Sequence, residues 1–467
     1  MDSRSHASLI DSPHSSSRVI WALAWPVILD QSFHTMVQYV DSAMVGSLGA
    51  VATAAVAANS STIWLVNGMM YAFGAAFAVL AARQIGAKNH EAVHHTVRQA
   101  LLAVVALAVV LTTVMLRIAP VLPLWIGVEA AVAPDAIIYI QYVAASYPFM
   151  ILFMFMTNLI RSSGDTRSPL ISNIITNLAN IIGNFLLIFP TRQVVLLGKT
   201  VTIPGAGMGV QGAAIATAGA MVLSSLILFG VLIFKEGPLR TPFRGVSWKV
   251  DWKLQRQVFR LGTPLALERA TLSVGQIVLT VLVTRIGTVS LAAHHLAITA
   301  ESVTYMPVSG FSMAATTLVA QSLGAEKREM ALDFAKKCLR WGIILMSSTG
   351  VLMFIFSHQL MSFFTHDPAV IALGSRVLRI EAFAQPFFAT SIVIGGILRG
   401  AGDTRWPFIN SLIGMWIVRL IPASILIIGF NFGLEAAWGC MVADLVVRGM
   451  LNYRRYHHNQ WTYAWKD

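Results

Sequence analysis

Residues 161–169 read Arg-Ser-Ser-Gly-Asp-Thr-Arg-Ser-Pro, and residues 399–407, 238 positions later, read Arg-Gly-Ala-Gly-Asp-Thr-Arg-Trp-Pro. The same offset relates Pro26 to Pro264, each of which lies at the start of a long apolar stretch. Internal repeats at a fixed offset are the signature of a duplicated architecture. We therefore expect the two halves of the chain to share one arrangement of elements.

The register of this repeat changes once. Residues 209–214 (Gly-Val-Gln-Gly-Ala-Ala) match residues 433–438 (Gly-Leu-Glu-Ala-Ala-Trp) at an offset of 224 instead of 238. The first copy therefore holds about 14 additional residues, which we place around Thr191–Pro204.

The composition of the 467-residue chain is that of an integral membrane protein. Apolar residues make up 56% and charged residues only 12%, and the mean hydropathy is +0.69; soluble proteins carry about 25% charged residues. A membrane-spanning helix needs about 20 mainly apolar residues. Segments of this kind lie at about 19–47, 52–81, 97–117, 134–160, 168–190, 208–234, 257–286, 290–320, 334–357, 370–398, 406–430 and 434–453.

These segments predict an all-α integral membrane protein with twelve transmembrane helices, six in each repeat. Apolar runs such as Leu101–Leu111 differ from the alternating strands of an outer-membrane barrel. Because six is even, the two copies enter the membrane in the same orientation, an arrangement typical of transporters whose substrate site lies between the lobes. The predicted parts are a tail over 1–18, an N-lobe over 19–234, a linker over 235–256, a C-lobe over 257–453 and a tail over 454–467.

The formal net charge of +12 reflects membrane topology in this interpretation. Of the 33 Lys and Arg residues, 25 fall in the loops on the side of the termini or in the adjoining ends of the spans, and the positive-inside rule makes that side cytoplasmic. We expect a multi-pass protein of the plasma membrane, such as a bacterial inner membrane, with both termini cytoplasmic and membrane lipid as a partner. Nucleic acid is not an expected partner, because no nucleic-acid-binding motif accompanies the charge.

Several short motifs, taken together and in order, resemble the multidrug and toxin extrusion (MATE) transporters, and the NorM-like branch more than the DinF-like branch. They are Val40–Gly46 (Val-Asp-Ser-Ala-Met-Val-Gly), Gly86–Lys88, Arg161–Arg167, Ile286–His294, Ala314–Gln321 and Arg399–Arg405. The resemblance extends from Pro26 to about Arg448. It implies a V-shaped pair of six-helix lobes related by pseudo-two-fold symmetry. It also implies export of organic cations and amphipathic compounds coupled to H⁺ or Na⁺.

The acid of the first predicted span, Asp41, is the leading coupling candidate. Charged groups at membrane depth are costly and usually functional, and burial favours the neutral form, so Asp41 could take up a proton or hold a cation. It matches the aspartate that the family resemblance implicates in coupling. Asn180 and Asn184 are spaced i, i+4 and share a helix face. The DinF-like branch carries Asn and Asp at these two positions; interhelical hydrogen bonding is the alternative role.

The second half offers Glu268, four residues after Pro264, as another coupling candidate. Under the 238-residue offset Glu268 matches Asp30. The alternative role for Glu268 is a structural ion pair, with Arg269 as one partner. The resemblance to the NorM-like branch implies a sodium site in this half, but the acids of that site match Leu272 and Phe388 here. Each half thus lacks an acid that the family's branches carry: Asn184 replaces one in the first half, and Leu272 and Phe388 replace others in the second. These absences favour protons over sodium as the coupling ion.

Other polar groups within the spans are candidates for the substrate cavity: Asp30, Tyr71, Glu301, Tyr305 and Gln385. We expect His294 and His295 to be exposed at the membrane interface. Arg161 and Arg399 are interpreted as headgroup anchors, and Asp165 or Thr166 as a helix cap.

The sequence leaves two cargo classes open. Multidrug efflux is favoured because the charged groups within the spans are mainly acidic, which suits cationic cargo. A lipid-linked sugar flippase or polysaccharide exporter of the same superfamily is the alternative. An enzyme is not expected, since neither a catalytic set nor a phosphate-binding loop is present. We expect no cofactor and no metal site beyond the coupling ion, and a monomer.

Overall fold

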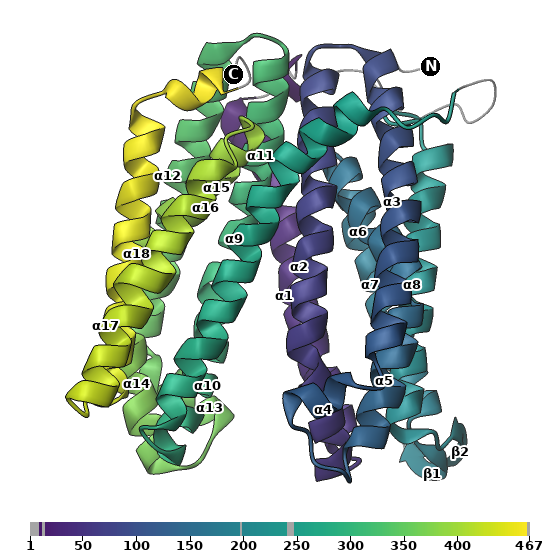
Figure 1. Cartoon of the computed structure of the whole chain (residues 1–467), viewed down its shortest axis with the longest axis vertical. Coiled ribbons are helices and arrows are strands. Elements are labelled where there is room, and N and C mark those ends of the chain that lie inside the picture. The colour runs from purple at the N-terminus through teal and green to yellow at the C-terminus, as the bar shows by residue number, and fades with distance from the viewer. Residues whose placement is uncertain (1–8, 12–14, 197–198, 241–246, 465–467) are drawn as a thin grey trace. The chain divides into compact units, whose positions relative to one another are not determined.

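The computed structural model describes residues 9–11, 15–196, 199–240 and 247–464 (Figure 1). Most of the predicted N-terminal tail and the end of the C-terminal tail lie outside these ranges. The first repeat contains α1 (Ser16–Gly46), α2 (Ala50–Gly86), α3 (His90–Ile118), α4 (Leu122–Ile126), α5 (Ala133–Ala145), α6 (Tyr147–Ser162), α7 (Arg167–Leu187) and α8 (Gly209–Phe234). A short helix, η2 (Leu9–Asp11), precedes them.

The second repeat contains a matching series. Its elements are α9 (Trp252–Thr284), α10 (Thr288–Tyr305), α11 (Val308–Gly324), α12 (Arg328–Ile355), α13 (Ser357–Phe364), α14 (Pro368–Ala382), α15 (Gln385–Gly400), α16 (Arg405–Leu412), η3 (Ile413–Leu420), α17 (Ile421–Ser424), η4 (Ile425–Gly429), α18 (Leu434–His457) and η5 (Gln460–Tyr463). Each of the twelve expected spans coincides with one helix or with consecutive helices of these two series.

Within the described residues, seven helical segments are individually long and apolar enough to cross a membrane. Two bent pairs, α5 with α6 and α14 with α15, also qualify when each pair is taken as one span, with bends of 51° and 60°. Each bend lies next to a proline in the first turn of the second helix, Pro148 or Pro386. These two prolines are again 238 positions apart. Because proline lacks the backbone N–H that would continue the hydrogen-bond ladder, both repeats bend at the same point.

The repeat is visible in the backbone itself. The non-glycine residues Lys88 and Glu326 have φ values of 57° and 59°, and they are repeat mates. Gly164 and Gly402, also repeat mates, have φ values of 97° and 79°. Left-handed conformations are uncommon for non-glycine residues, so their recurrence at equivalent positions confirms the duplication.

The ends of α2 and α11 cross at very short range. A Cβ atom built on Gly86 would lie 1.9 Å from the carbonyl oxygen of Gln321, and one on Gly324 would lie 1.9 Å from the carbonyl oxygen of Arg83. Gly86 and Gly324 are repeat mates, as are Arg83 and Gln321. The crossing is therefore reciprocal, and each helix contributes one glycine that lets the other backbone approach.

The additional residues of the first repeat form an antiparallel hairpin. Strands β1 (Pro190–Leu196) and β2 (Lys199–Ala206) pair with Val194 opposite Val201, and a register shift interrupts the ladder near Pro190. The hairpin lies at the end of α7 and α8 (Figure 1). The insertion expected around 191–204 is thus a compact extension of the connection between these two helices.

The chain divides into two compact units. The early unit comprises Asp30–Ala78 and Glu91–Arg256; the late unit comprises the described residues up to Leu29, Val79–His90 and those from Gln257 onward. In the late unit Trp21 of α1 packs edge-on against Phe311 and Trp341, with ring centroids 5.0 and 5.5 Å apart. This division differs from the predicted lobes, whose boundaries remain a prediction.

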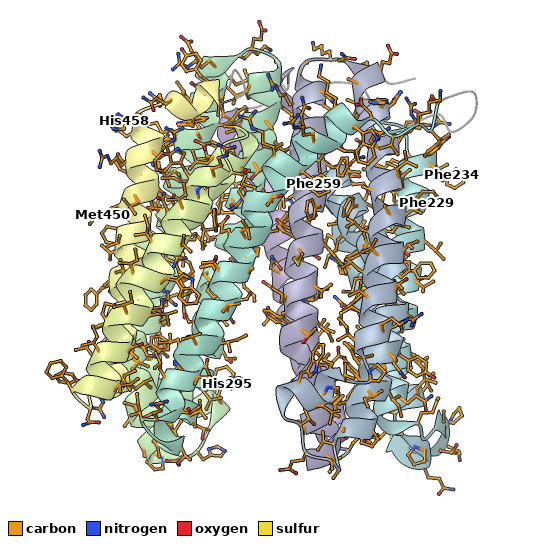
Figure 2. All side chains as sticks on the ribbon, in the orientation of Figure 1. Phe229, Phe234, Phe259, His295, Met450 and His458 are labelled. Carbon is orange, nitrogen blue, oxygen red and sulfur yellow. The ribbon has the colours of Figure 1, made fainter. Side chains whose placement is uncertain are left out.

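Large apolar side chains point outward along the helices. Phe234, Phe259 and Met450 are 80%, 53% and 54% exposed (Figure 2). A soluble protein would bury such residues, whereas lipid chains solvate them well. The exterior therefore agrees with a membrane location.

Candidate functional site

Asp41 of α1 and the two asparagines of α7 lie together in the early unit. The Asn184 amide nitrogen donates to Asp41 Oδ1 at 2.8 Å. Rotating the Asn180 amide by half a turn places its nitrogen 2.9 and 3.0 Å from the two Asp41 carboxylate oxygens, which satisfies both groups. Tyr139 of α5 is close enough to interact electrostatically with Asp41. The structure therefore brings together the three coupling candidates that the sequence indicated for this half.

This arrangement can exchange a proton or a cation. The amide N–H groups stabilise the ionised carboxylate, while the buried Asn184 Oδ1 atom has no hydrogen-bond partner among the side chains that the structure describes. A buried unsatisfied acceptor calls for a physical explanation. A protonated Asp41 could donate to such an oxygen, and a sodium ion would bind carboxylate and amide oxygens. The chemistry of the cluster thus suits either coupling ion.

Asp30, by contrast, is held in a buried ion pair. Arg161 Nη2 and Asn173 Nδ2 each donate to its carboxylate at 2.6 Å. The Asp30 and Arg161 side chains are both 9% exposed. The expectation that Arg161 anchors at the headgroups is wrong, because a buried carboxylate needs a compensating charge and Arg161 supplies it.

The second repeat has a looser version of the same contact. Arg399 Nη1 lies 3.9 Å from Glu268 Oε2, and Ser411 Oγ lies 3.5 Å from Glu268 Oε1. These three residues are the repeat mates of Arg161, Asp30 and Asn173, in that order. The ion-pair partner of Glu268 is therefore Arg399 and not the adjacent Arg269, and Arg399 is not a headgroup anchor.

A larger buried charge cluster lies in the late unit. Arg419 of η3 and Arg448 of α18 both donate to the fully buried Asp444 carboxylate, with Arg419 Nη2 2.7 Å from Oδ2. Glu301 of α10 and Glu381 of α14 are close neighbours and both interact electrostatically with Arg419. Within the described part of the chain, neither carboxyl oxygen of Glu381 has a partner at hydrogen-bonding distance.

The charges of this cluster do not balance unless a proton or cation is added. Three carboxyl groups face two guanidinium groups, so full ionisation leaves one negative charge in a buried site. Burying an uncompensated charge is expensive. One bound proton or one monovalent cation brings the cluster to neutrality.

The remaining cavity candidates lie in different surroundings. Gln385 is fully buried and accepts a hydrogen bond from Thr304 at 3.2 Å. Thr304 lies on α10, one helical turn after Glu301. Tyr305 packs against Phe388, with ring centroids 5.5 Å apart. Tyr71 is partly buried on α2 in the early unit. Of the proposed cavity set, Glu301 belongs to the charge cluster, and Gln385 contacts the residue one helical turn from it.

The two adjacent histidines behave differently. His294 is 1% exposed and its Nδ1 accepts a hydrogen bond from Trp438 Nε1 at 3.1 Å. The expectation that it is exposed is wrong, because the helix turns this side chain toward α18. His295 is exposed, as expected (Figure 2).

The connection after Ser162 is tied to the end of α8. The Asp165 carboxylate accepts from the Ser168 backbone N–H at 3.0 Å and from Lys235 Nζ at 2.6 Å. Burial alone would raise the pKa of Asp165, but these hydrogen bonds outweigh it and lower the pKa. Asp165, rather than Thr166, supplies the side-chain cap of α7.

Duplicated apolar helices with buried acidic sites in each repeat define a multi-pass membrane transporter. The model of the MatE family matches residues 26–186 and 264–425. These segments begin at Pro26 and Pro264, so the family pattern occurs once in each repeat. The chain belongs to the MatE family.

Curated relatives match nearly the whole chain. A probable multidrug resistance protein NorM of Thermotoga maritima is 28% identical over 443 residues, covering 94% of this chain and 92% of the relative. The multidrug resistance protein MdtK of Yersinia pestis is 26% identical, covering 91% and 94%. An uncharacterized transporter, YisQ of Bacillus subtilis, is 25% identical and covers 97% of each chain.

Solved structures share the fold. A multidrug resistance MATE family transporter in an outward-facing conformation aligns with a TM-score of 0.88 at 18% identity, covering 97% of this chain and 98% of that one. A MATE structure in complex with MaL6 aligns with a TM-score of 0.87 at 19% identity, with the same coverage. The expected all-α membrane fold is thereby confirmed.

Proposed function

We propose that this protein exports amphipathic and cationic compounds across the plasma membrane by antiport with protons or sodium ions. The observation that carries the proposal is the Asp41 cluster, where two amide groups donate to a carboxylate in an apolar span and an amide oxygen lacks a partner among the described residues. The names of the NorM and MdtK relatives support multidrug export.

Coupling through Asp41 requires the carboxylate to change its hydrogen-bond partners when it binds its ion. In the ionised form the two asparagine amides on α7 donate to it. Ion binding neutralises the carboxylate and weakens this attachment of α1 to α7. Pro26, which lies within α1, removes one backbone hydrogen bond and leaves a bend point. Loading and release of the ion at Asp41 would therefore alter how α1 bends.

The charge cluster of the late unit supports a second ion-binding position. Glu301 and Glu381 lack a full complement of positive partners, and the cluster is neutral with one additional proton or cation. Glu268 remains a candidate, although its contact with Arg399 gives it a competing role in an ion pair. We favour protons because paired carboxylates can share one proton without any further ligand.

The membrane topology belongs to the same proposal. The basic loops favour a cytoplasmic location for both termini and for the linker over 235–256. We propose the plasma membrane as the location and a monomer as the functional unit. A flippase for a lipid-linked sugar is the alternative cargo class; the buried arginines that could attract its phosphate groups are engaged with carboxylates.

The deciding experiment is efflux of a fluorescent organic cation from proteoliposomes under separate proton and sodium gradients. We expect a proton gradient to drive export by the wild-type protein, and Asp41→Asn to abolish both export and the accompanying proton movement. Glu129→Gln, at an exposed acid of the same unit, is the matched control and should transport normally. Full coupled export by Asp41→Asn would refute the assigned site. Export driven by sodium at symmetric pH would refute the proton preference.

A further inference from the structure

An apolar groove runs along α3 on the surface of the early unit. It encloses about 740 Å³, within the range of about 300–1,000 Å³ that small-molecule sites occupy. Helix α3 forms its floor, α6 and α8 contribute to its walls, and Trp248 of the linker lies at one end. Representative lining residues are Leu101, Val105, Thr112, Phe149, Phe229 and Trp248.

The length of the groove along α3 slightly exceeds the thickness of one leaflet of a bilayer. Its lining on α3 begins at Leu101 and ends at Thr113, a rise of about 18 Å for an α-helix. The hydrocarbon core of a bilayer is about 30 Å thick, or about 15 Å for each leaflet. Within the span predicted over 97–117, the groove therefore begins near the linker side of the membrane and extends past the midplane, which lies near residue 107.

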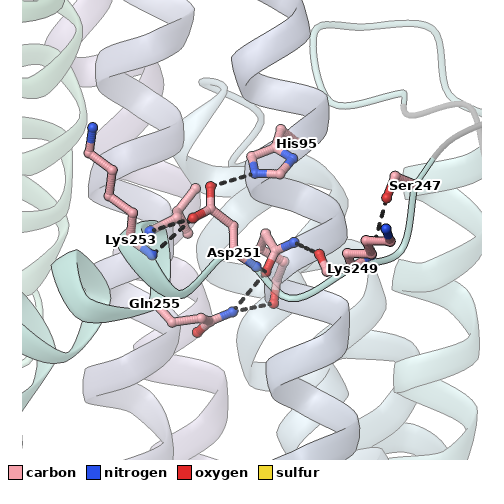
Figure 3. A network of polar contacts seen from close by, with 8 residues as sticks. His95, Ser247, Lys249, Asp251, Lys253 and Gln255 are labelled. Carbon is pink, nitrogen blue, oxygen red and sulfur yellow. Dashed lines mark hydrogen bonds and ion pairs between the residues drawn. The ribbon is translucent and has the colours of Figure 1, made fainter.

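The end of the groove is fixed by hydrogen bonds between the linker and α3 (Figure 3). Gln99 Nε2 donates to the Lys249 carbonyl oxygen at 2.7 Å, and the Asp251 N–H donates to Gln99 Oε1 at 3.0 Å. His95 Nε2 lies 3.0 Å from Asp251 Oδ2, and this hydrogen bond is the main reason that the pKa of Asp251 is lowered. These contacts hold Trp248, the residue before Lys249, beside the groove.

Positive charge lies at this same end. Arg98 is one helical turn before Leu101 on the stripe that continues through Val105 and Ala108, because residues spaced by three and four share a helix face. The partly buried Arg98 has a buried Nε atom that finds no hydrogen-bond partner among the described residues. Lys249 is exposed next to Trp248. An apolar groove thus ends at two cationic side chains.

We propose that the groove binds one acyl chain of an anionic phospholipid from the leaflet on the linker side, with the headgroup phosphate at Arg98 and Lys249. The apolar lining suits the chain, and the guanidinium group of the partly buried Arg98 is a hydrogen-bond donor of the kind that phosphate oxygens accept. Trp248 lies where chain and headgroup meet, the level at which tryptophan is enriched in membrane proteins. The site shares no residue with the Asp41 cluster, so it does not depend on the transport mechanism.

Native mass spectrometry of the full-length protein tests this proposal. The purified protein is equilibrated with mixed micelles that contain equal amounts of phosphatidylglycerol and phosphatidylethanolamine, and the retained lipid is measured. Arg98→Gln should lower the retention of phosphatidylglycerol about fivefold, because a basic residue near the membrane surface contributes about 1 kcal/mol of attraction. Its retention of phosphatidylethanolamine should fall less, because the ammonium group of that lipid offsets the phosphate charge. Arg117→Gln, at the exposed opposite end of α3, is the control.

A second variant tests the groove itself. Val105→Trp should fill it and lower the retention of both lipids, whereas Val110→Trp, on α3 but outside the groove, should not. Val105→Phe replaces Val105→Trp if the latter does not elute as a single species in size exclusion. Unchanged phosphatidylglycerol retention by Arg98→Gln, or unchanged retention by the groove-filling variant, would overturn the proposal. So would adducts with the mass of a free fatty acid in place of phospholipid.

Discussion

The crossing of α2 and α11 yields the sharpest prediction, because the atoms that meet there belong to two backbones. In Gly86→Ala the new Cβ would lie 1.9 Å from the Gln321 carbonyl oxygen, whereas Cβ atoms essentially never approach closer than 3.0 Å. The two helices must therefore separate by at least 1.1 Å, the difference between these distances. A side chain could change rotamer to relieve the contact, but a carbonyl group within a helix cannot. Overpacking typically costs 1–3 kcal/mol, and we expect about 3 kcal/mol here.

The reciprocal geometry predicts how two substitutions combine. Gly324→Ala creates the same 1.9 Å contact with the Arg83 carbonyl oxygen, so it should cost a similar free energy of unfolding. Once either alanine has separated the helices, much of the room that the other needs is already present. The double variant should therefore be destabilised by at least 1 kcal/mol less than the sum of the single variants, as expected for residues that share one contact.

Thermal unfolding in detergent, monitored by the fraction that remains monodisperse in size exclusion, measures these effects. Gly219→Ala and Gly230→Ala in α8 are the matched controls, because a Cβ at either position meets no atom within 4 Å. They should leave the midpoint unchanged or raise it, since alanine favours helix over glycine. A Gly86→Ala protein as stable as these controls, or additive effects of the two crossing variants, would contradict the prediction.

Two further predictions concern the charged contacts. Asp30→Asn should lower the free energy of unfolding by about 3 kcal/mol, because it leaves Arg161 buried without its counter-charge. Glu268→Gln should lower it by less than about 1 kcal/mol, since the Glu268–Arg399 pair is longer and more exposed. A smaller midpoint shift for Asp30→Asn than for Glu268→Gln contradicts this order. The pKa of Asp165 is lower in the folded protein than the ordinary aspartate value of 3.8. Its bond with Lys235 should therefore stabilise the fold fully at pH values above 3.8, and this contribution should be lost as the pH falls through the lowered pKa. At pH 7 the free energy of unfolding of Asp165→Asn should be about 1 kcal/mol lower than that of the wild-type protein. The difference between their unfolding midpoints should shrink at strongly acidic pH.

The periodic and repeated parts of the fold could be predicted from sequence. Long apolar segments identify the spans because lipid accepts only apolar helix surfaces, and the constant offset between Pro26 and Pro264 identifies the duplication. The insertion near 191–204 was located by a change of offset, although its hairpin conformation was not predicted. Asp41, Asn180 and Asn184 could be grouped because the two asparagines share a helix face and the family resemblance relates them to Asp41.

The ion-pair partners could not be predicted in the same way. Arg161 is 131 positions from Asp30, and only the packing of α6 against α1 brings them together. Arg419 and Asp444 interrupt apolar stretches, which is a signal that could have identified them. Their pairing, however, depends on how η3 and α18 are rotated about their axes, and neither composition nor spacing specifies that rotation.

The paired contacts around Asp30 and Glu268 show what a fused duplicate permits. In a symmetric dimer of six-span chains, one gene would encode both sites, so any substitution that tightened one would tighten the other. Here the same three repeat positions hold a 2.6 Å buried ion pair in one copy and a 3.9 Å pair in the other. Because the two copies are fused into one chain, they could diverge, and equivalent positions now hold one tight ion pair and one loose ion pair.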